Sequence, residues 1–176
     1  MPVQHAMAAL GAAAVLAASG CSGSDNFNDS DVSFAQGMIP HHEQAVEMAG
    51  LAESRAGSDE VRDLATEVSQ AQGPEIETMT TWLEEWDEDV PEPMEEMDDM
   101  SMPGMMSSEE MSALEDAKGA EFDQQWLTMM IEHHSGAIEM AQVEQEDGQH
   151  EDAVALAEEI EQAQAAEIEQ MEQLLG

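Results

Sequence analysis

Residues 38–49 read MIPHHEQAVEMA, and residues 130–141 read MIEHHSGAIEMA. The same separation of 92 residues, from His41 to His133, aligns QAQ at 70–72 with QAQ at 162–164. It also aligns EIE at 75–77 with EIE at 167–169, and no gap is needed from residue 34 to residue 83. A match that holds register over this length indicates an internal duplication.

Each copy has the apolar spacing of a helical hairpin. In the first copy, the pattern predicts helices over about 31–55 and 59–86, with Ser58 as the N-cap of the second. Pro40 and Pro74 fall inside these helices, where kinks are expected.

The second copy opens with a capping box from Ser107 to Glu110. Its first helix is expected to reach about residue 146, with a break near Gly119. After the turn at Asp147-Gly148, a last helix runs to the C-terminus. The fold class is therefore all-α: residues 31–176 form one four-helix bundle from two duplicated helical hairpins.

In an up-down-up-down bundle, the two histidine-bearing helices run parallel, diagonally across the core. All histidines and methionines of the repeat would then meet at one level. The long linker between the copies leaves an antiparallel arrangement open, in which case the histidine pairs separate into two sites.

The repeated stretches place metal-ligating side chains on one helical face. His41 lies three residues after Met38, and Met48 lies ten residues after Met38, so all three share one helical face with His41 in the middle. The second copy repeats this spacing. The neighbouring histidine lies about 100° further round the helix. Imidazole together with thioether favours copper, as Cu(I) or Cu(II), with silver as a mimic. The predicted ligands are His41, His42, His133, His134, Met38, Met48, Met130 and Met140.

The linker at 87–107 joins the two hairpins and is acidic, with Pro and Gly among its residues. It is not expected to form a regular helix. Six of the chain's 16 methionines lie in it, which predicts a second, flexible soft-metal site. These residues are Met94, Met97, Met100, Met102, Met105 and Met106.

The chain carries 41 acidic and 3 basic residues, a formal charge of −38. Contacts to phosphate need clustered Lys or Arg, so nucleic acid is excluded as a partner. Electrostatic binding to anionic lipid is excluded for the same reason. A field of this sign attracts cations, and metal ions are the expected partners.

Residues 1–20 are small and apolar, and they end directly before Cys21. The segment is short for a membrane span but fits the apolar part of a secretory signal. The sole cysteine stands where bacterial lipoproteins carry their lipidated residue, and residues 21–30 read as a tether. The sequence therefore predicts export as a cell-surface or periplasmic lipoprotein, with membrane contact only through its lipid anchor.

Two other functions remain open. No catalytic motif is found, which indicates a binding protein rather than an enzyme, but Glu43, Glu47 and Glu139 could serve a bundle oxidase as oxygen ligands. Alternatively, the histidines form a pH-responsive pair in a metal-free interaction module. Trp82 and Trp86, at a helix end, could support a homo-oligomer.

Three stretches resemble a known family: FAQGMIPHHEQAVEMA at 34–49, MPGMMSSEEM at 102–111, and FDQQWLTMMIEHHSGAIEMAQ at 122–142. They are similar to the domain of unknown function 305 family (DUF305). Its members are bacterial, often secreted or lipid-anchored, and are described as ferritin-like four-helix bundles. Some are periplasmic copper-binding proteins linked to copper tolerance. The resemblance implies a ferritin-like fold for 31–176 and copper binding by the four histidines, followed by the four helical methionines.

Overall fold

The computed structural model describes residues 26–92 and 102–176. The predicted signal segment, Cys21 and the middle of the linker lie outside these ranges. Within them the chain is all-helical, and a single isolated β-bridge joins Ala56 to Gly119. The helices are α1 (Asp29–Arg55), α2 (Asp59–Trp86), α3 (Ser108–Asp116), α4 (Ala120–Asp147) and α5 (Glu151–Leu175).

The helix boundaries follow local capping chemistry. Asn28 and Asp31 form a capping box at the start of α1, so the helix begins before residue 31, inside the segment predicted as tether. Ser58 caps α2, as predicted, and Ser107 with Glu110 caps α3. The predicted break near Gly119 separates α3 from α4, and Gly119 has a positive φ of 63°.

Both internal prolines lie within continuous helices. Pro40 is inside α1 and Pro74 is inside α2, and each helix continues to the end predicted from the sequence. Their loss of one backbone donor does not end either helix, since packing against neighbouring helices stabilises both.

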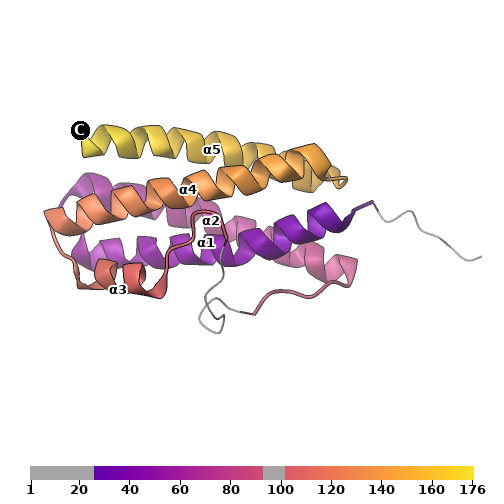
Figure 1. Cartoon of the computed structure of the whole chain (residues 1–176), viewed down its shortest axis with the longest axis horizontal. Helices are drawn as coiled ribbons and strands as arrows, with labels where there is room; N and C mark the ends of the chain where they lie inside the picture. Colours follow the sequence, from indigo (N-terminus) through magenta and orange to yellow (C-terminus); the bar gives the residue numbers. More distant parts are fainter. Residues whose placement is uncertain (1–25, 93–101) are drawn as a thin grey trace, which may run out of the picture.

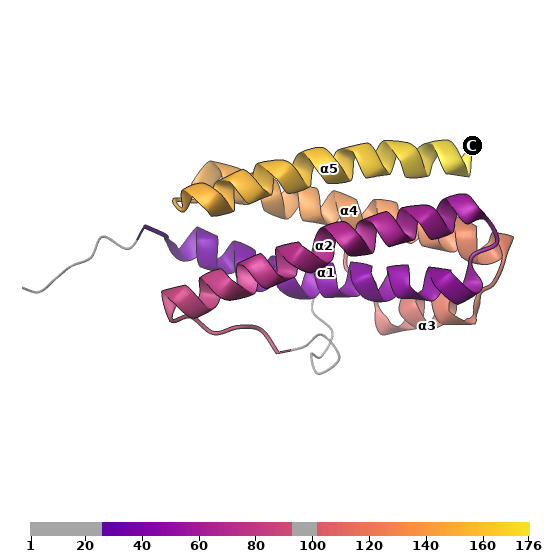
Figure 2. The same ribbon diagram turned by 180° about the vertical axis from the view of Figure 1, so that it is seen from behind.

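Two hairpins, α1–α2 and α4–α5, pack through α1 against α4 (Figures 1 and 2). The start of α1 lies at the end of α4, where Asn28 donates to the Asp147 carbonyl at 2.8 Å. At the other end, the Gly119 amide donates to the Arg55 carbonyl at 2.8 Å. Helices α1 and α4 are therefore adjacent and antiparallel. Of the two directions that the sequence left open, the structure has the antiparallel one, because the linker with α3 returns the chain to the end where α1 stops.

The antiparallel contact relates the two halves by an approximate twofold axis. Residues that are equivalent in the repeat, such as His41 and His133, face each other only near this axis. The histidine pairs consequently meet in the middle of the α1–α4 contact and do not separate into two sites.

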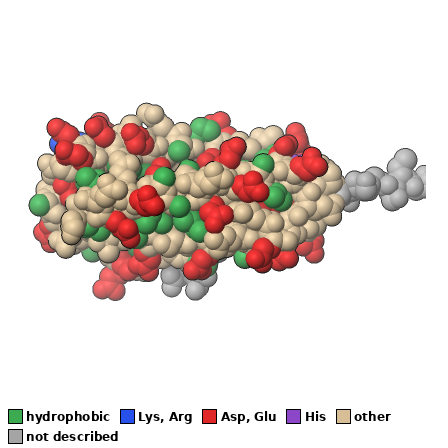
Figure 3. All heavy atoms as spheres, turned by 90° about the horizontal axis from the view of Figure 1, so that it is seen from above, with side chains coloured by type: hydrophobic (Ala, Val, Ile, Leu, Met, Phe, Trp, Pro, Cys, Tyr) green, Lys and Arg blue, Asp and Glu red, His purple; other side chains and the backbone are tan. Residues whose placement is uncertain are grey.

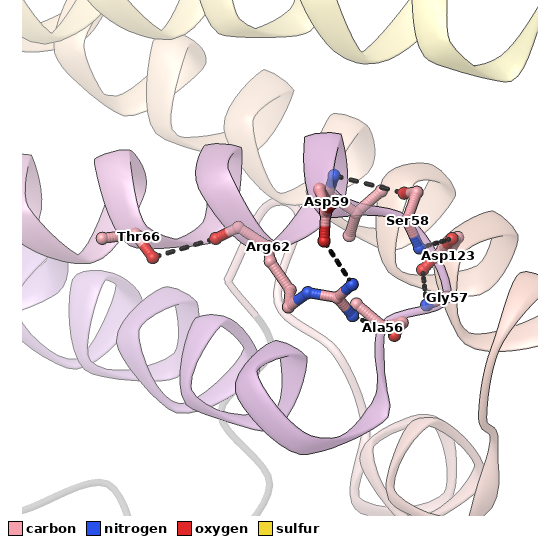
Figure 4. Close-up of polar contacts among 8 residues, drawn as sticks. Ala56, Gly57, Ser58, Asp59, Arg62, Thr66 and Asp123 are labelled. Carbon is pink, nitrogen blue, oxygen red and sulfur yellow. Dashed lines mark hydrogen bonds and ion pairs between the residues drawn. The ribbon is translucent and has the colours of Figure 1, made fainter.

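The ends of the bundle are held by side chains that reach between hairpins. The Asp123 carboxylate, in the first turn of α4, accepts from the Gly57 and Ser58 amides at 2.8 and 2.9 Å (Figure 4). In the same corner Arg62 pairs with Asp59 at 2.6 Å and donates to the Ala56 carbonyl. The α1–α2 turn is thereby fixed to the second hairpin.

Trp82 and Trp86 contact groups of their own chain. Trp86 stacks on Phe27 with ring centroids 4.7 Å apart, and both indoles pack against His150, at 5.4 and 5.1 Å. Trp82 is buried. Both indoles therefore have partners within the chain, and Trp86 remains half-buried.

The surface carries the acidic character of the sequence. Asp and Glu side chains are spread along the whole face in Figure 3. No helix among the described residues has the length and apolar character required to cross a membrane.

Candidate metal centre

A polar layer crosses the middle of the bundle. The hydrophobic core consists of two clusters, one around Leu64, Trp126 and Met130, the other around Phe34, Leu83 and Ile160. Between them, each long helix contributes two polar residues that are buried or half-buried. The polar layer comprises His41, His42, Gln72, Glu75, His133, His134, Gln164 and Glu167.

His41 and His133 are in ring-to-ring contact at the centre of this layer. Their centroids are 3.8 Å apart, and both side chains are fully buried. The repeat places them at equivalent positions on helices that cross at the twofold axis. The sequence predicted that the histidines of the two copies meet, and the structure brings this pair together.

The second histidine of each pair turns toward its own hairpin partner. Nε2 of His42 donates to a Glu75 carboxylate oxygen at 2.6 Å, and Nε2 of His134 donates to Glu167 at 2.6 Å. Carboxylate–histidine pairs of this kind fix the tautomer and orient the ring of ligating histidines. We did not predict Glu75 and Glu167 as site residues, although both lie in the repeated EIE segments.

Several buried nitrogen atoms in the layer have no hydrogen-bond partner. They are the Nδ1 atoms of His41, His42 and His134, both ring nitrogens of His133, and Nε2 of Gln72. A buried polar atom left unpaired costs about 1–3 kcal/mol, and native proteins contain few of them. These unpaired atoms are concentrated in one layer of the bundle.

The two central imidazoles are held in the neutral form that binds metals. Burial, with smaller effects from neighbouring histidines, lowers the pKa of His41 to about 3 and that of His133 well below its ordinary value. A neutral ring has one lone pair to donate. In His41, Nε2 donates to the Pro103 carbonyl at 3.1 Å, so Nδ1 has the free lone pair.

The helical methionines flank the layer in two pairs. Met38 and Met140 belong to one hydrophobic cluster, and Met48 and Met130 to the other. Met140 is half-buried, whereas the other three are fully buried. The expectation that four thioethers converge on one level is wrong, because antiparallel helices place Met38 beside the second methionine of the other copy.

Three of the six linker methionines lie within the described residues. Met106 is buried, and Met102 and Met105 are half-buried. The Met102 sulfur lies 3.9 Å from where a Cβ on Gly37 would stand, next to Met140. Met94, Met97 and Met100 lie outside the described residues.

The layer does not hold a preassembled cluster of metal ligands. Among the described residues, no three His, Cys, Asp or Glu side chains stand at the mutual spacing of a metal site. His41 and His133 are the imidazoles of the two copies whose rings are in contact. Nitrogen with thioether sulfur is the donor set that selects copper in its lower oxidation state.

Fold and layer together define an all-α bundle of two packed helical hairpins with a buried, histidine-rich centre. The chain belongs to the DUF305 family, described as a domain of unknown function, whose profile matches residues 31–175. No match was found among curated proteins.

Solved structures extend this comparison. A Streptomyces coelicolor DUF305 protein, considered to be secreted, is 35% identical with a TM-score of 0.76, over 83% of this chain and 91% of that one. A Deinococcus radiodurans DUF305 fragment is 30% identical with a TM-score of 0.75, over 85% and 97%. CopM in its Cu(I)-bound form is 32% identical with a TM-score of 0.68, over 82% and 94%. CopM is also known in Cu(II)-bound and silver-bound forms.

Proposed function

We propose that this protein binds copper or silver ions outside the cytoplasm, for sequestration, buffering or delivery. The observation that carries the proposal is the polar layer, in which five imidazole nitrogens are buried without a partner. Copper- and silver-bound forms of a relative at 32–33% identity support the same ion class.

The histidines and glutamates of the layer have distinct roles in this proposal. Nδ1 of His41 and one ring nitrogen of His133 are the first donors to the metal, because the two rings are already in contact. His42 and His134 donate through Nδ1, since Glu75 and Glu167 hold their Nε2 atoms. A bound copper ion would supply a soft Lewis-acid centre, and the chain's part is to enclose and orient the donors.

The methionines give the site its preference for soft ions. The Met38–Met140 and Met48–Met130 pairs lie on the two sides of the layer and can offer thioethers to Cu(I) or Ag(I). Met94, Met97, Met100, Met102, Met105 and Met106 form a second, weaker collecting site along the linker in this proposal. The acidic surface concentrates cations near both.

Export and lipid anchoring at Cys21 remain part of the proposal. The support is the sequence pattern of residues 1–21, together with the relative considered to be secreted. Metabolic labelling with a palmitate analogue, followed by Cys21→Ala, would test it: the label should be lost in the variant.

The metal site is tested by titrating the purified protein with Cu(I) and with Ag(I). Replacing His41 and His133 together with Ala should lower affinity at least about tenfold, because each ligand lost from a metal centre costs more than one hydrogen bond. His150→Asn is the matched control: this histidine lies outside the layer, and Asn keeps the cap that His150 provides to α5. Unchanged affinity and stoichiometry in the double variant would reject the proposed function.

A further inference from the structure

The strap, defined as Met102–Met106, is the non-helical segment that lies across α1 and α4 at the level of the polar layer. Its Pro103 carbonyl accepts from His41 Nε2 at 3.1 Å. A Cβ on Gly104 would lie 2.6 Å from the Glu132 carbonyl oxygen and 2.9 Å from that of His133. The strap therefore lies directly on the backbone of the histidine-bearing turns.

The repeat is broken at the position where the strap sits. Gln44 of α1 corresponds to Gly136 of α4 at the separation of 92 residues. The Gln44 side chain makes two hydrogen bonds to the strap: its Oε1 accepts from the Met106 amide at 2.7 Å, and its Nε2 donates to the Met106 carbonyl at 2.9 Å. At Gly136 a Cβ would lie 2.1 Å from the Pro103 carbonyl oxygen, so any side chain would displace the strap. One copy thus holds the strap and the other makes room for it.

The strap is also the cover most easily moved. His41, His42, His133 and His134 are fully buried, so an ion reaches them only when something opens. Helices α2 and α5 cover the layer through Glu75 and Glu167, and moving them would expose both hydrophobic clusters. Among the described residues, the strap is anchored by two hydrogen bonds to Gln44, one to His41 and the buried side chain of Met106, a far smaller contact than that of α2 or α5.

We propose that the strap Met102–Met106 is a gate. It must open before a soft cation can reach His41 and His133, and it retains the ion after it has closed. This inference rests on the proposed function and adds how access is controlled. The closed strap also fixes the Nε2–H tautomer of His41, so that the lone pair available to a metal ion remains on Nδ1. The half-buried Met102 on its outer end supplies a sulfur on the entry side.

Two variants open the gate without removing any proposed ligand. Gly136→Ala introduces the clash with Pro103, and Gln44→Ala removes both hydrogen bonds to Met106. Gly50→Ala and Gly73→Ala are matched controls, because an added Cβ there meets no heavy atom within 4 Å. If Gly136→Ala does not fold, Gln44→Ala carries the test alone.

Strap opening is measured first without metal, by hydrogen exchange of the Met106 amide. Exchange should accelerate at least about tenfold in both variants, because each variant weakens at least one hydrogen bond of the strap, and it should not change in the controls. Unchanged exchange in both variants overturns the gate, since the strap would not be held by these contacts.

The second measurement is stopped-flow uptake of Ag(I), and its release to a competing thioether chelator. Uptake and release should both accelerate about tenfold in the variants, with the equilibrium affinity changed less than either rate. Faster exchange with unchanged Ag(I) rates overturns the gate but leaves the metal site intact. Absence of Ag(I) binding in the wild type rejects the proposed function, and the gate with it.

Discussion

Asp31 and Asp123 are equivalent in the repeat, and each closes the hairpin turn of the other half. Asp123 accepts from the amides of the α1–α2 turn, and Asp31 accepts from the Gln149 and His150 amides of the α4–α5 turn at 3.0 and 2.9 Å. The duplication has thus produced reciprocal clamps at both ends of the α1–α4 contact.

The two clamps differ in burial, which sets their contributions to stability. Asp31 is fully buried and also accepts from the Asn28 amide at 2.5 Å, whereas Asp123 is half-buried. We expect Asp31→Asn to lower the free energy of unfolding by about 2–3 kcal/mol and Asp123→Asn by about 1 kcal/mol. Urea denaturation measures both, with the exposed Asp63→Asn as control. If both variants lost the same free energy of unfolding, burial of the carboxylate would not determine how much each clamp contributes to stability.

A buried carboxyl pair is present at only one of the two clamps. Glu144 shares a hydrogen bond with Asp31 and accepts from Ser30 Oγ at 3.1 Å, while the equivalent residue in the first copy is Ala52. Burial, followed by the hydrogen bond to Asp31 and the charge of Asp31, raises the pKa of Glu144 to about 8. Burial opposes ionisation of Asp31 too, but hydrogen bonds from Glu144 and three backbone amides lower its pKa overall.

This pair predicts that stability falls as pH rises. Because the folded pKa of Glu144 lies above its unfolded value, the folded state holds a proton that the unfolded state has released. The stability this gives is complete below the unfolded pKa, decreases as pH rises toward about 8, and is lost above that.

Glu144→Gln keeps the neutral group at every pH and should remove this dependence. The stability difference between the variant and the wild type is therefore expected to grow in the variant's favour as pH rises from about 6 to about 9. Urea denaturation at several pH values, with Asp123→Asn as control, measures it. A difference that stays constant with pH would mean that Glu144 is ionised in the folded protein throughout.

Glu75 and Glu167 are expected to act as positioning residues for the metal site. Replacing each by Gln removes the charge behind His42 or His134 and allows the ring to turn, which typically lowers metal affinity by about 10–100-fold. Ag(I) titration measures the effect, and His proton NMR shifts report the altered tautomer without metal. The exposed Glu77→Gln and Glu169→Gln, two residues further along each helix, are the controls. Equal behaviour of all four variants would exclude a specific role.

The sequence predicted most of the helices because their signals are local. Ser58, the Ser107–Glu110 capping box and the break at Gly119 each depend on residues within one turn. The meeting of His41 with His133 was expected for parallel helices only; in the antiparallel arrangement the two residues meet because both lie near the twofold axis. What stayed open was the direction of α4, because the linker length permits either direction.

The clamps, the carboxylate–histidine pairs and the strap depend on contacts across many residues. His42 and Glu75 are 33 residues apart, as are His134 and Glu167, and Pro103 is 62 residues from His41. Only the repeat gave a signal for such pairs: positions kept in both copies include EIE and QAQ, whose Glu75, Gln72 and counterparts form the layer. The exchange of Gln44 for Gly136 is a departure from the repeat, and its meaning depends on where the strap lies.

The flanking methionines offer the sharpest test of ion preference. Two double variants are proposed, in which both Met38 and Met140, or both Met48 and Met130, are replaced by Leu. Each removes two thioethers while conserving volume, so the free energy of unfolding should change by less than about 1.5 kcal/mol per residue. Affinity for Cu(I) and Ag(I) should fall in both double variants, and affinity for Cu(II) should change less, because only sulfur is lost.

The repeat provides a control for these variants. Met79 and Met171 are equivalent and fully buried in the same two clusters, but they lie on α2 and α5 and not on the histidine-bearing helices. Replacing both by Leu is expected to leave Cu(I) and Ag(I) affinity unchanged, as measured by competition with a calibrated chelator. If all three pairs lowered affinity equally, buried thioethers would bind the ion irrespective of place, and the polar layer would not define the site.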